Sequence, residues 1–340
     1  MKDITPLICA IVAFAVTAGL GYIVIPYLKR LKFGQTILDI GPNWHKEKEG
    51  TPTMGGVMMI AGVLLSLAIA YAYSAIVKGH FATEMKNPYR LSVFLAGLIM
   101  ALCMSAIGFM DDYIKVVKKR NLGLTARQKT FLQLFVSAAY LATLCISGMK
   151  TTYIPFVGDI DITSGIGLIF WPIALMFIYG FTNAVNLTDG IDGLASTVTL
   201  VVACAFMLGS GFLYNMGINA LSASLAGACV GFIVWNAKPA KVFMGDTGSM
   251  FLGGMVVAVS FGIGRPILLI FAGTTYLLEA LSDIIQVVYY KRTKKRLFKM
   301  APLHHHFEMS GWSEQKIVYV FSGIAAIGCV IALLPIIFNW

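Results

Sequence analysis

Ten apolar stretches, each about as long as a membrane-spanning helix, restrict the fold of this chain more than any other feature. A helix needs about 20 apolar residues to cross the hydrocarbon core of a bilayer. Only 12% of the 340 residues are charged, whereas a soluble domain carries roughly 25%. The stretch from Ser249 to Tyr290 is too long for one crossing, and Arg265-Pro266 is the natural place to divide it. We therefore predict an all-α polytopic membrane protein, one integral-membrane domain over residues 1–340, with about ten transmembrane helices at Ile4–Tyr27, Met54–Val77, Leu91–Met110, Thr130–Gly148, Ile166–Phe181, Leu194–Leu213, Ile218–Trp235, Ser249–Gly264, Ile267–Tyr290 and Ile317–Phe338.

Basic residues lie mostly on one side of this predicted bundle. The loops that follow the odd-numbered helices hold 20 of the 26 lysines and arginines. Basic loops stay in the cytoplasm, so we predict that both termini lie outside. The formal net charge of +10 then reflects topology and does not indicate nucleic-acid binding. A basic membrane face also attracts anionic substrates and lipid phosphates.

One loop on the predicted outer side has a pattern of its own. From Tyr153 to Thr163, apolar and polar residues alternate around Gly158-Asp159. Alternation with a period of two is typical of a strand, and a glycine at the centre is typical of a tight turn. We therefore predict a short outer hairpin near residues 153–163.

Acidic residues are few, and several of them gather at the predicted cytoplasmic ends of helices. Asp111 and Asp112 follow the third helix, Asp189 and Asp192 follow the fifth, and Asp246 precedes the eighth. Only 16 residues in the chain are acidic. Their collection on one side therefore indicates a candidate site.

Spacing within these segments supports a site and leaves structural alternatives open. Asp111 and Lys115 are four residues apart, so they form either an ordinary ion pair on a helix or part of a site. In Asn183–Asp192, four oxygen-bearing side chains recur at every third position, which predicts a polar stripe on one helix face. A turn with capping residues is the alternative there. Asp246, within FMGDTGS, serves either as a helix cap or as a ligand beside a bound phosphate.

Three further polar segments lie near the same predicted face. Glu279, Asp283 and Gln286 share one side of the ninth helix and form either a wet cavity or a structural network. The run His304–His306 can donate to phosphate or carry protons, and it is a poor zinc site because neighbouring side chains point in different directions. The segment KEGTPTMGG (Lys48–Gly56) is a hydroxyl- and glycine-rich helix entry that, facing the others, could hold an anion.

The combination of these residue types indicates a class of chemistry. Hard oxygen ligands without cysteine partners favour Mg²⁺, with Mn²⁺ as an alternative, over zinc. Carboxylates, lysines and glycine-rich helix starts together are typical of phosphoryl transfer, in which cations neutralise the charge on the transferred group.

Five motifs resemble one family of membrane enzymes. The chain is similar to the phospho-N-acetylmuramoyl-pentapeptide transferases, which belong to the polyprenyl-phosphate N-acetylhexosamine-1-phosphate transferases. The resemblance extends from about Lys48 to Glu308. It is carried by TPTMGG, DDYIK (Asp111–Lys115), NAVNLTDGIDGL (Asn183–Leu194), FMGDTGS and PLHHHFE, in this order.

The resemblance implies a reaction at the cytoplasmic face of the bacterial inner membrane. Undecaprenyl phosphate attacks the β-phosphate of UDP-N-acetylmuramoyl-pentapeptide, giving lipid I and UMP, and the family suggests a homodimer. The implied metal is Mg²⁺ on Asp246, with Asp111 and Asp112 as further candidates. The implied catalytic residues are Asp111, Asp112, Lys115, Lys129, Asp246, His304, His305 and His306. The implied substrate-binding residues are Lys48, Thr51, Thr53, Asn183, Asn186, Asp189, Asp192, Asn236, Phe243 and Gln286.

Alternative functions remain at this point. A sister enzyme that transfers GlcNAc-1-phosphate to the same lipid would share the aspartates and the metal. An intramembrane prenyltransferase would need an N-D-x-x-D-x-x-x-D pattern, and a CDP-alcohol phosphotransferase would need an arginine in its aspartate–glycine motif; the chain has neither. An anionic-solute transporter would place its acids near the bilayer midplane and show an internal repeat. For the lipid phosphate itself, direct and two-step displacement both stay open, with Asp111 as base, nucleophile or metal-linked group.

Overall fold

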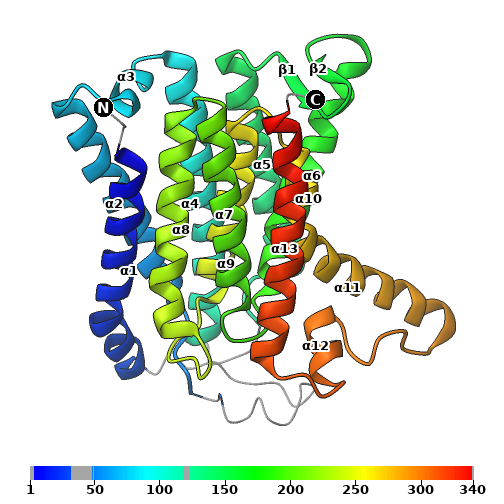
Figure 1. The fold of residues 1–340 in the computed structure, drawn as a ribbon. Coiled ribbons are helices and arrows are strands. Elements are labelled where there is room, and N and C mark those ends of the chain that lie inside the picture. The colour runs from blue at the N-terminus through cyan, green and yellow to red at the C-terminus, as the bar shows by residue number, and fades with distance from the viewer. Residues whose placement is uncertain (1–3, 32–47, 49, 118–121, 339–340) are drawn as a thin grey trace.

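The computed structural model describes residues 4–31, 48, 50–117 and 122–338. These residues form a bundle of helices with one small β-hairpin at one end (Figure 1). The elements are α1 (Thr5–Arg30), α2 (Gly56–Ile76), α3 (His80–Glu84), α4 (Pro88–Val117), α5 (Ala126–Ser147), β1 (Thr151–Ile154), β2 (Gly158–Asp161), the 3₁₀ helix η2 (Gly165–Ile169), α6 (Phe170–Thr188), α7 (Leu194–Phe212), α8 (Met216–Asn236), α9 (Gly245–Gly262), α10 (Leu268–Ala272), α11 (Thr274–Thr293), α12 (Leu303–Glu308) and α13 (Glu314–Ile337).

The helices confirm an all-α, multi-pass membrane protein. Within the described ranges, eight helices are long and apolar enough to cross a bilayer: α1, α2, α4, α5, α6 with η2, α7, α8 and α13. Two further predicted crossings correspond to α9, which opens with five polar or small residues, and to α11, which is too polar to qualify. The count of ten crossings and the orientation of the termini stay predictions, although α1 starts and α13 ends at the same end of the bundle (Figure 1).

Small residues let the central helices approach one another closely. In α9 every residue from Thr247 to Phe261 is buried, and α8 is buried along most of its length. A methyl group added at Gly254 of α9 would lie 2.6 Å from the Cα atom of Ala101 in α4. Membrane helices lack a hydrophobic driving force against lipid and associate through such close contacts. The α4–α9 contact is therefore a rigid part of the bundle centre.

The ninth predicted crossing differs from the structure. The segment Ile267–Tyr290, predicted as one helix, is instead two helices, α10 and α11, that meet at Gly273. A side chain at Gly273 would lie 2.7 Å from both the Leu269 carbonyl oxygen and the Phe181 ring, so the chain turns where only glycine fits. The boundary predicted at Arg265-Pro266 is present between α9 and α10. Beyond Gly273, α11 leans away from the bundle (Figure 1).

The predicted hairpin is confirmed with a shifted turn. Strands β1 and β2 pair antiparallel, with Thr151 opposite Asp161 and Ile154 opposite Gly158. The turn therefore lies at residues 155–157, with Phe156 at a φ of +66°, and not at Gly158-Asp159. Figure 1 shows the hairpin at the end of the bundle where α13 ends.

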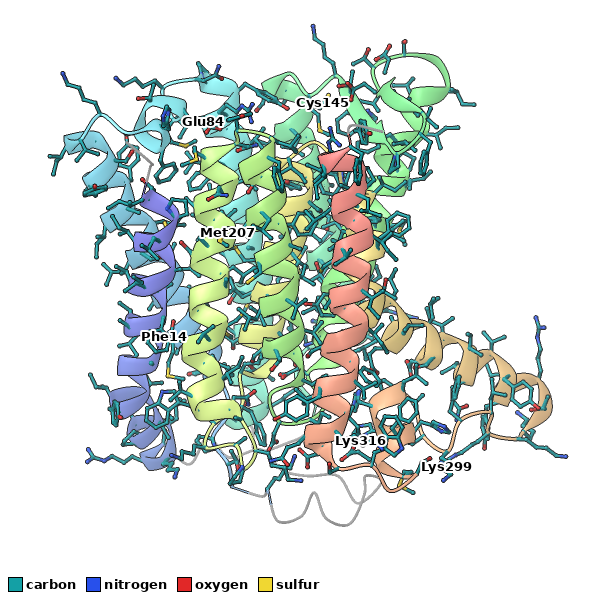
Figure 2. The ribbon with its side chains drawn as sticks, viewed as in Figure 1. Phe14, Glu84, Cys145, Met207, Lys299 and Lys316 are labelled. Carbon is teal, nitrogen blue, oxygen red and sulfur yellow. The ribbon has the colours of Figure 1, made fainter. Side chains whose placement is uncertain are left out.

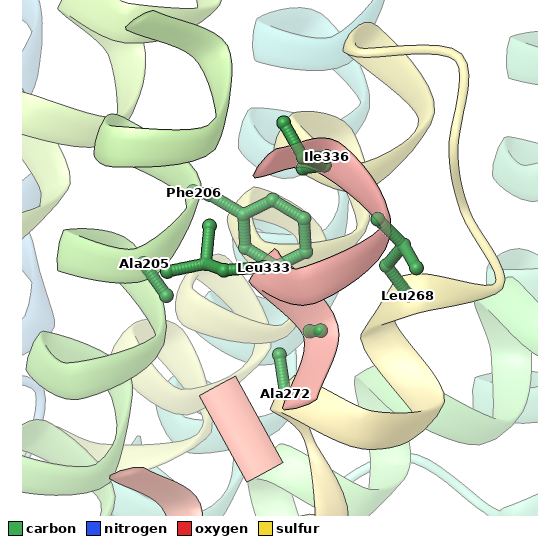
Figure 3. A pocket seen from close by; sticks show the side chains of 7 residues that line it. Ala205, Phe206, Leu268, Ala272, Leu333 and Ile336 are labelled. Carbon is green, nitrogen blue, oxygen red and sulfur yellow. The ribbon is translucent and has the colours of Figure 1, made fainter. Parts of the chain in front are cut away.

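A small pocket opens between α7, α10 and α13 (Figure 3). All of its lining side chains are apolar, so it offers no group for recognition or catalysis. The lining residues are Ala205, Phe206, Leu268, Ala272, Ala332, Leu333 and Ile336.

Candidate active site

Three carboxylates meet where the end of α4 touches the start of α9. One ligand atom from each of Asp111, Asp112 and Asp246 lies within 4.8 Å of the others. The sequence analysis expected both aspartates just after the helix, but α4 extends to Val117 and both lie inside it. Both are only 4% exposed. The contact is close because a methyl group on Gly108 would lie 2.1 Å from the backbone oxygen of Asp246.

Asp112 caps the first turn of α9. Its Oδ1 accepts from the backbone N–H of Asp246 at 3.2 Å, and its Oδ2 accepts from the N–H and the hydroxyl of Thr247 at 2.9 and 2.7 Å. A helix N-terminus has unpaired N–H groups and a partial positive charge, which a carboxylate satisfies. Asp246, read in the sequence as a possible cap, is itself free of that task because Asp112 from another helix performs it.

Two lysines hold the remaining carboxylates together. Lys115 contacts Asp111 at 2.6 Å and Asp246 at 3.3 Å, so the i,i+4 ion pair exists and also reaches across to α9. Lys129, in the first turn of α5, contacts Asp246 at 2.7 Å. Leu124 donates its backbone N–H to Asp111 Oδ1 at 2.7 Å. The cluster is therefore a mixed-charge centre built from α4, α5 and α9.

The predicted polar stripe on α6 is only half present. Asn186 donates to Asp246 Oδ1 at 3.0 Å and to the Ser249 hydroxyl at 2.7 Å. Asn183 lies one turn away and exchanges two hydrogen bonds of 3.2 Å with Gln133 of α5. Its contact is therefore with a neighbouring helix and not with the carboxylates.

Asp189 and Asp192 lie beyond α6 and face different neighbours. Asp189 is the residue that ends α6, and burial raises its pKa well above the usual range, with further increases from Asp246, Asp112 and Asp192. Asp192 is buried and accepts from Lys48 at 2.7 Å and from the Ala240 N–H at 3.0 Å. The two aspartates therefore have different partners, and Asp192 pairs with Lys48 rather than with the carboxylate cluster.

Lys48 lies between two carboxylates. Its ammonium contacts Asp192 at 2.7 Å and Glu314 at 2.8 Å. Burial lowers the pKa of Lys48, but these two partners raise it by more, so its pKa lies above the usual range. Glu314 also contacts Lys238 at 2.9 Å. This cluster ties the start of α13 to the loops before α2, after α6 and after α8.

We expect Glu314→Gln to destabilise the folded protein by about 2 kcal/mol, because it leaves Lys48 without one of its two partners. Glu314 is 3% exposed, whereas Lys238 is 41% exposed, so Lys238→Gln should cost much less. Thermal melting of the purified protein in detergent checks both variants. Equal melting temperatures for Glu314→Gln and the wild type would contradict a stabilising role for this ion-pair cluster.

The loop before α2 and the loop before α9 are joined by backbone hydrogen bonds. Phe243 donates its N–H to the Pro52 carbonyl at 2.8 Å, and its own carbonyl accepts from the Gly55 N–H at 2.8 Å. Thr53 is buried and Thr51 is half-buried. The TPTMGG segment and the segment before α9 therefore form one unit, as expected if they face a common ligand.

Asn236 links the loop after α6 to the loop before α9. Its carbonyl oxygen accepts from the Gly193 N–H at 3.0 Å, and its amide donates to the Val242 carbonyl at 3.0 Å. Both ends of this side chain are therefore engaged with backbone, and Asn236 positions the loops that carry Asp192 and Phe243.

The three histidines face three different partners. His304 is 1% exposed, and its Nδ1 lies 3.0 Å from a carboxylate oxygen of Glu279, which is fully buried. His305 Nδ1 lies 2.7 Å from Glu308, and His306 Nδ1 accepts from the Lys299 N–H at 3.1 Å. The three Nδ1 atoms thus have three different partners, although the His304 and His305 ring centroids lie only 4.1 Å apart.

His304 also reaches the loop that follows α6. A methyl group on Gly190 would lie 2.1 Å from His304 Nε2, so this ring edge packs on the backbone beside Asp189. Gln286, an implied substrate-binding residue, accepts from the N–H groups of Leu297 and Phe298 at 3.0 Å each. Glu279 and Gln286 are thus engaged in holding the segments that follow α11.

The cluster has the composition of a divalent-metal site. Asp111, Asp112 and Asp246 carry three negative charges when ionised, and Lys115 and Lys129 return two. Oxygen donors gathered this closely suit Mg²⁺. The described residues therefore fit a bound Mg²⁺.

Four polar contributors escaped the sequence analysis. Gln133 and Glu314 each stand in or at the start of an apolar helix, as isolated polar residues. Thr247 and Ser249 lie in FMGDTGS beside Asp246 and were not singled out. The signal that could have found them is the free-energy cost of a polar side chain in an apolar helix, which is tolerated only when the side chain has a partner.

The Gln133–Asn183 pair fixes α5 against α6 next to two of the three side chains that donate to Asp246. Lys129 stands one turn before Gln133, and Asn186 stands one turn after Asn183. We expect Gln133→Leu to lower kcat about 10-fold with little change in KM, because Lys129 and Asn186 both shift relative to Asp246. Gln128→Leu, in the exposed capping box of the same helix, is the matched control and should keep kcat. Equal kcat in both variants would contradict a positioning role.

Comparison with known proteins places the chain in a family. Residues 94–263 match the family model described as glycosyl transferase family 4. Proteins named phospho-N-acetylmuramoyl-pentapeptide-transferase are similar over nearly the whole chain. That of Clostridioides difficile is 43% identical over 96% of both chains, that of Caldicellulosiruptor bescii 41% over 98% of both, and that of Acetivibrio thermocellus 44% over 94% of this chain and 92% of its own. The chain therefore belongs to glycosyl transferase family 4 and, within it, to the phospho-N-acetylmuramoyl-pentapeptide-transferases.

Proposed function

We propose that this chain transfers phospho-MurNAc-pentapeptide from UDP-MurNAc-pentapeptide to undecaprenyl phosphate, giving lipid I and UMP. The observation that carries the proposal is the carboxylate–lysine cluster of Asp111, Asp112, Asp246, Lys115 and Lys129, in a chain that matches the named relatives nearly end to end. Phosphoryl transfer depends mainly on positioning and on neutralising negative charge. A buried mixed-charge cluster at a helix start supplies both.

We propose different duties for the three aspartates. Asp112 has both oxygens bound to the first turn of α9, so it orients that helix and is a poor base or nucleophile. Asp246 would hold Mg²⁺ with one of its neighbours, and the bound ion would neutralise the pyrophosphate. Asp111 is left to orient the lipid phosphate. Since a phosphate monoester has a second pKa near 6, most of it is already ionised at neutral pH, and Asp111 works more by position than by removing a proton.

The lysines and His304 position the groups that would bind the substrate. Lys115 and Lys129 donate to Asp246, which keeps its carboxylate ionised and oriented. Their positive charges would also stabilise the substrate phosphates. His304, packed against Gly190, fixes the loop that holds Asp189. We propose that this end of the bundle faces the cytoplasm, where the nucleotide substrate is made, because basic loops gather there. The family resemblance supports a homodimer, which mass measurement in detergent can check.

A UMP-release assay tests the proposal. Purified protein with undecaprenyl phosphate should release UMP from UDP-MurNAc-pentapeptide and not from UDP-GlcNAc. Chelation should stop the reaction, and added Mg²⁺ should restore it. Release with UDP-GlcNAc alone would overturn the proposal in favour of the sister GlcNAc-1-phosphate transferase, and activity that survives complete chelation would overturn the metal assignment.

A further inference from the structure

Helix α11 is anchored in the bundle by its first half only. Its buried residues are Thr275, Tyr276, Glu279 and Ser282, all within its first nine positions. From Asp283 to the end of the helix no side chain is buried. The helix leaves the side of the bundle obliquely and slants outward toward the level of α12 (Figures 1 and 2). Its second half therefore meets whatever surrounds the protein.

The exposed half of α11 starts with an apolar band. Its side chains are between 37% and 57% exposed and cover more than one face of the helix. Water does not favour such a continuous apolar surface, whereas the edge of a bilayer does. The band closes with two tyrosines, a residue type that prefers the level of the headgroups. Its members are Leu281, Ile284, Ile285, Val287, Val288, Tyr289 and Tyr290.

A cluster of cations follows the tyrosines directly. Five of the six positions from Lys291 to Arg296 are lysine or arginine, and all are exposed. Among the residues that the structure describes, no carboxylate lies within the 4.0 Å ion-pair distance of these five side chains. Gln286 accepts from the N–H groups of Leu297 and Phe298, which holds the chain after the helix against its side. The five cations are therefore gathered at one point.

We propose that this basic tip, defined as Lys291, Arg292, Lys294, Lys295 and Arg296, binds the headgroups of anionic phospholipids. Each cation near a charged leaflet gains electrostatic energy, and clusters of four to eight beside an apolar helix are typical of such binding. The order of residues along α11 gives the depth of each segment in the bilayer. The apolar band lies in the acyl region, the tyrosines lie at its boundary, and the cations lie among the phosphates. An acidic protein partner would match the charges but not the adjoining apolar band. The proposal concerns the lipid around the enzyme and stands apart from the transfer reaction.

Photocrosslinking in nanodiscs tests the proposal. The intact protein is placed in phosphatidylcholine nanodiscs that carry a photoactivatable lipid, either phosphatidylglycerol or phosphatidylcholine, and labelled peptides are mapped. We expect the segment 284–299 to take up at least about 10-fold more phosphatidylglycerol than phosphatidylcholine. Neutralising all five tip residues to glutamine should bring the two probes to equal labelling. Raising the salt to about 0.5 M should also reduce the preference.

A pair of variants separates a lipid site from general basic topology. Helix α1 also ends with an exposed Lys29-Arg30 pair, as α11 ends with Lys291-Arg292. K291Q/R292Q should lower phosphatidylglycerol labelling of 284–299 at least about 3-fold, whereas K29Q/R30Q should leave it unchanged. Equal labelling by the two lipids in the wild type, or an equal effect of the two pairs, would overturn the proposal. Protein–protein crosslinks at 284–290 in place of lipid would overturn it as well, in favour of a second copy on this surface.

Discussion

Asp246→Asn should lower UMP release about 10³-fold, with a much smaller loss of thermal stability. The carboxylate of Asp246 is the one group that contacts Lys115, Lys129 and Asn186 at once. Asparagine keeps the shape but removes the charge that holds the lysines and would bind Mg²⁺, and loss of such preorganised electrostatics has effects of this size. Burial raises the pKa of Asp246, but Lys129 and Lys115 lower it by more, so the charged carboxylate is stabilised in the fold and its loss also costs some stability.

Three measurements make the Asp246→Asn result decisive. Initial rates and a Mg²⁺ titration give the activity and the apparent metal affinity, and thermal melting reports the fold. Asp159→Asn is the matched control, because Asp159 is an exposed aspartate on β2 at the other end of the bundle. It should stay within about 2-fold of the wild type. An Asp246→Asn protein with more than a tenth of wild-type activity would remove Asp246 from the centre of the mechanism.

Gly108→Ala should lower activity about 10²-fold and also lower the melting temperature. The added methyl would lie 2.1 Å from the carbonyl oxygen of Asp246, 2.4 Å from its carbonyl carbon and 2.8 Å from the Thr247 nitrogen. All three atoms belong to the backbone, so no side chain can rotate away and α4 must move from α9. A shift of roughly 1 Å in the relative position of catalytic groups is enough for a loss of this size.

Gly323→Ala is the control for that substitution. Gly323 lies inside α13, and a methyl group there would meet no atom within 4 Å. Alanine favours a helix over glycine by about 1 kcal/mol, so this variant should melt at the same or a higher temperature and keep its activity. If Gly108→Ala behaved like Gly323→Ala, the close contact of α4 with α9 would have no role in forming the site.

The carboxylate cluster was accessible from sequence because acids are scarce in an apolar chain. Asp111, Asp112 and Asp246 each stand at the end of an apolar stretch on the same predicted side, and helices in a bundle bring such ends together. The helix class followed from the same apolar stretches. The inference about the site depends on the high free energy of a charged side chain in lipid, which is tolerated only where the charge is paired or functional.

The direction of individual side chains was not accessible in that way. Asn183 and Asp192 continue a three-residue spacing with Asn186, yet Asn183 turns to Gln133 and Asp192 leaves the helix to meet Lys48. Spacing places residues on a helix face only while the helix lasts, and α6 ends at Thr188. The break at Gly273 likewise depends on contacts with Phe181, from a distant part of the chain, which no local pattern records.

The cap that Asp112 places on α9 ties the site to the order of synthesis. The residues that it joins are 135 positions apart, so α5, α6, α7 and α8 all leave the ribosome before the N–H groups that Asp112 binds. During that interval Asp112 lacks the helix start that later binds both of its oxygens, whereas Asp111 already has Lys115 and the Leu124 N–H as partners. Insertion of α9 between helices already in place thus completes both the bundle centre and the site. A chain stopped after α8 would carry most of its membrane helices and no active centre.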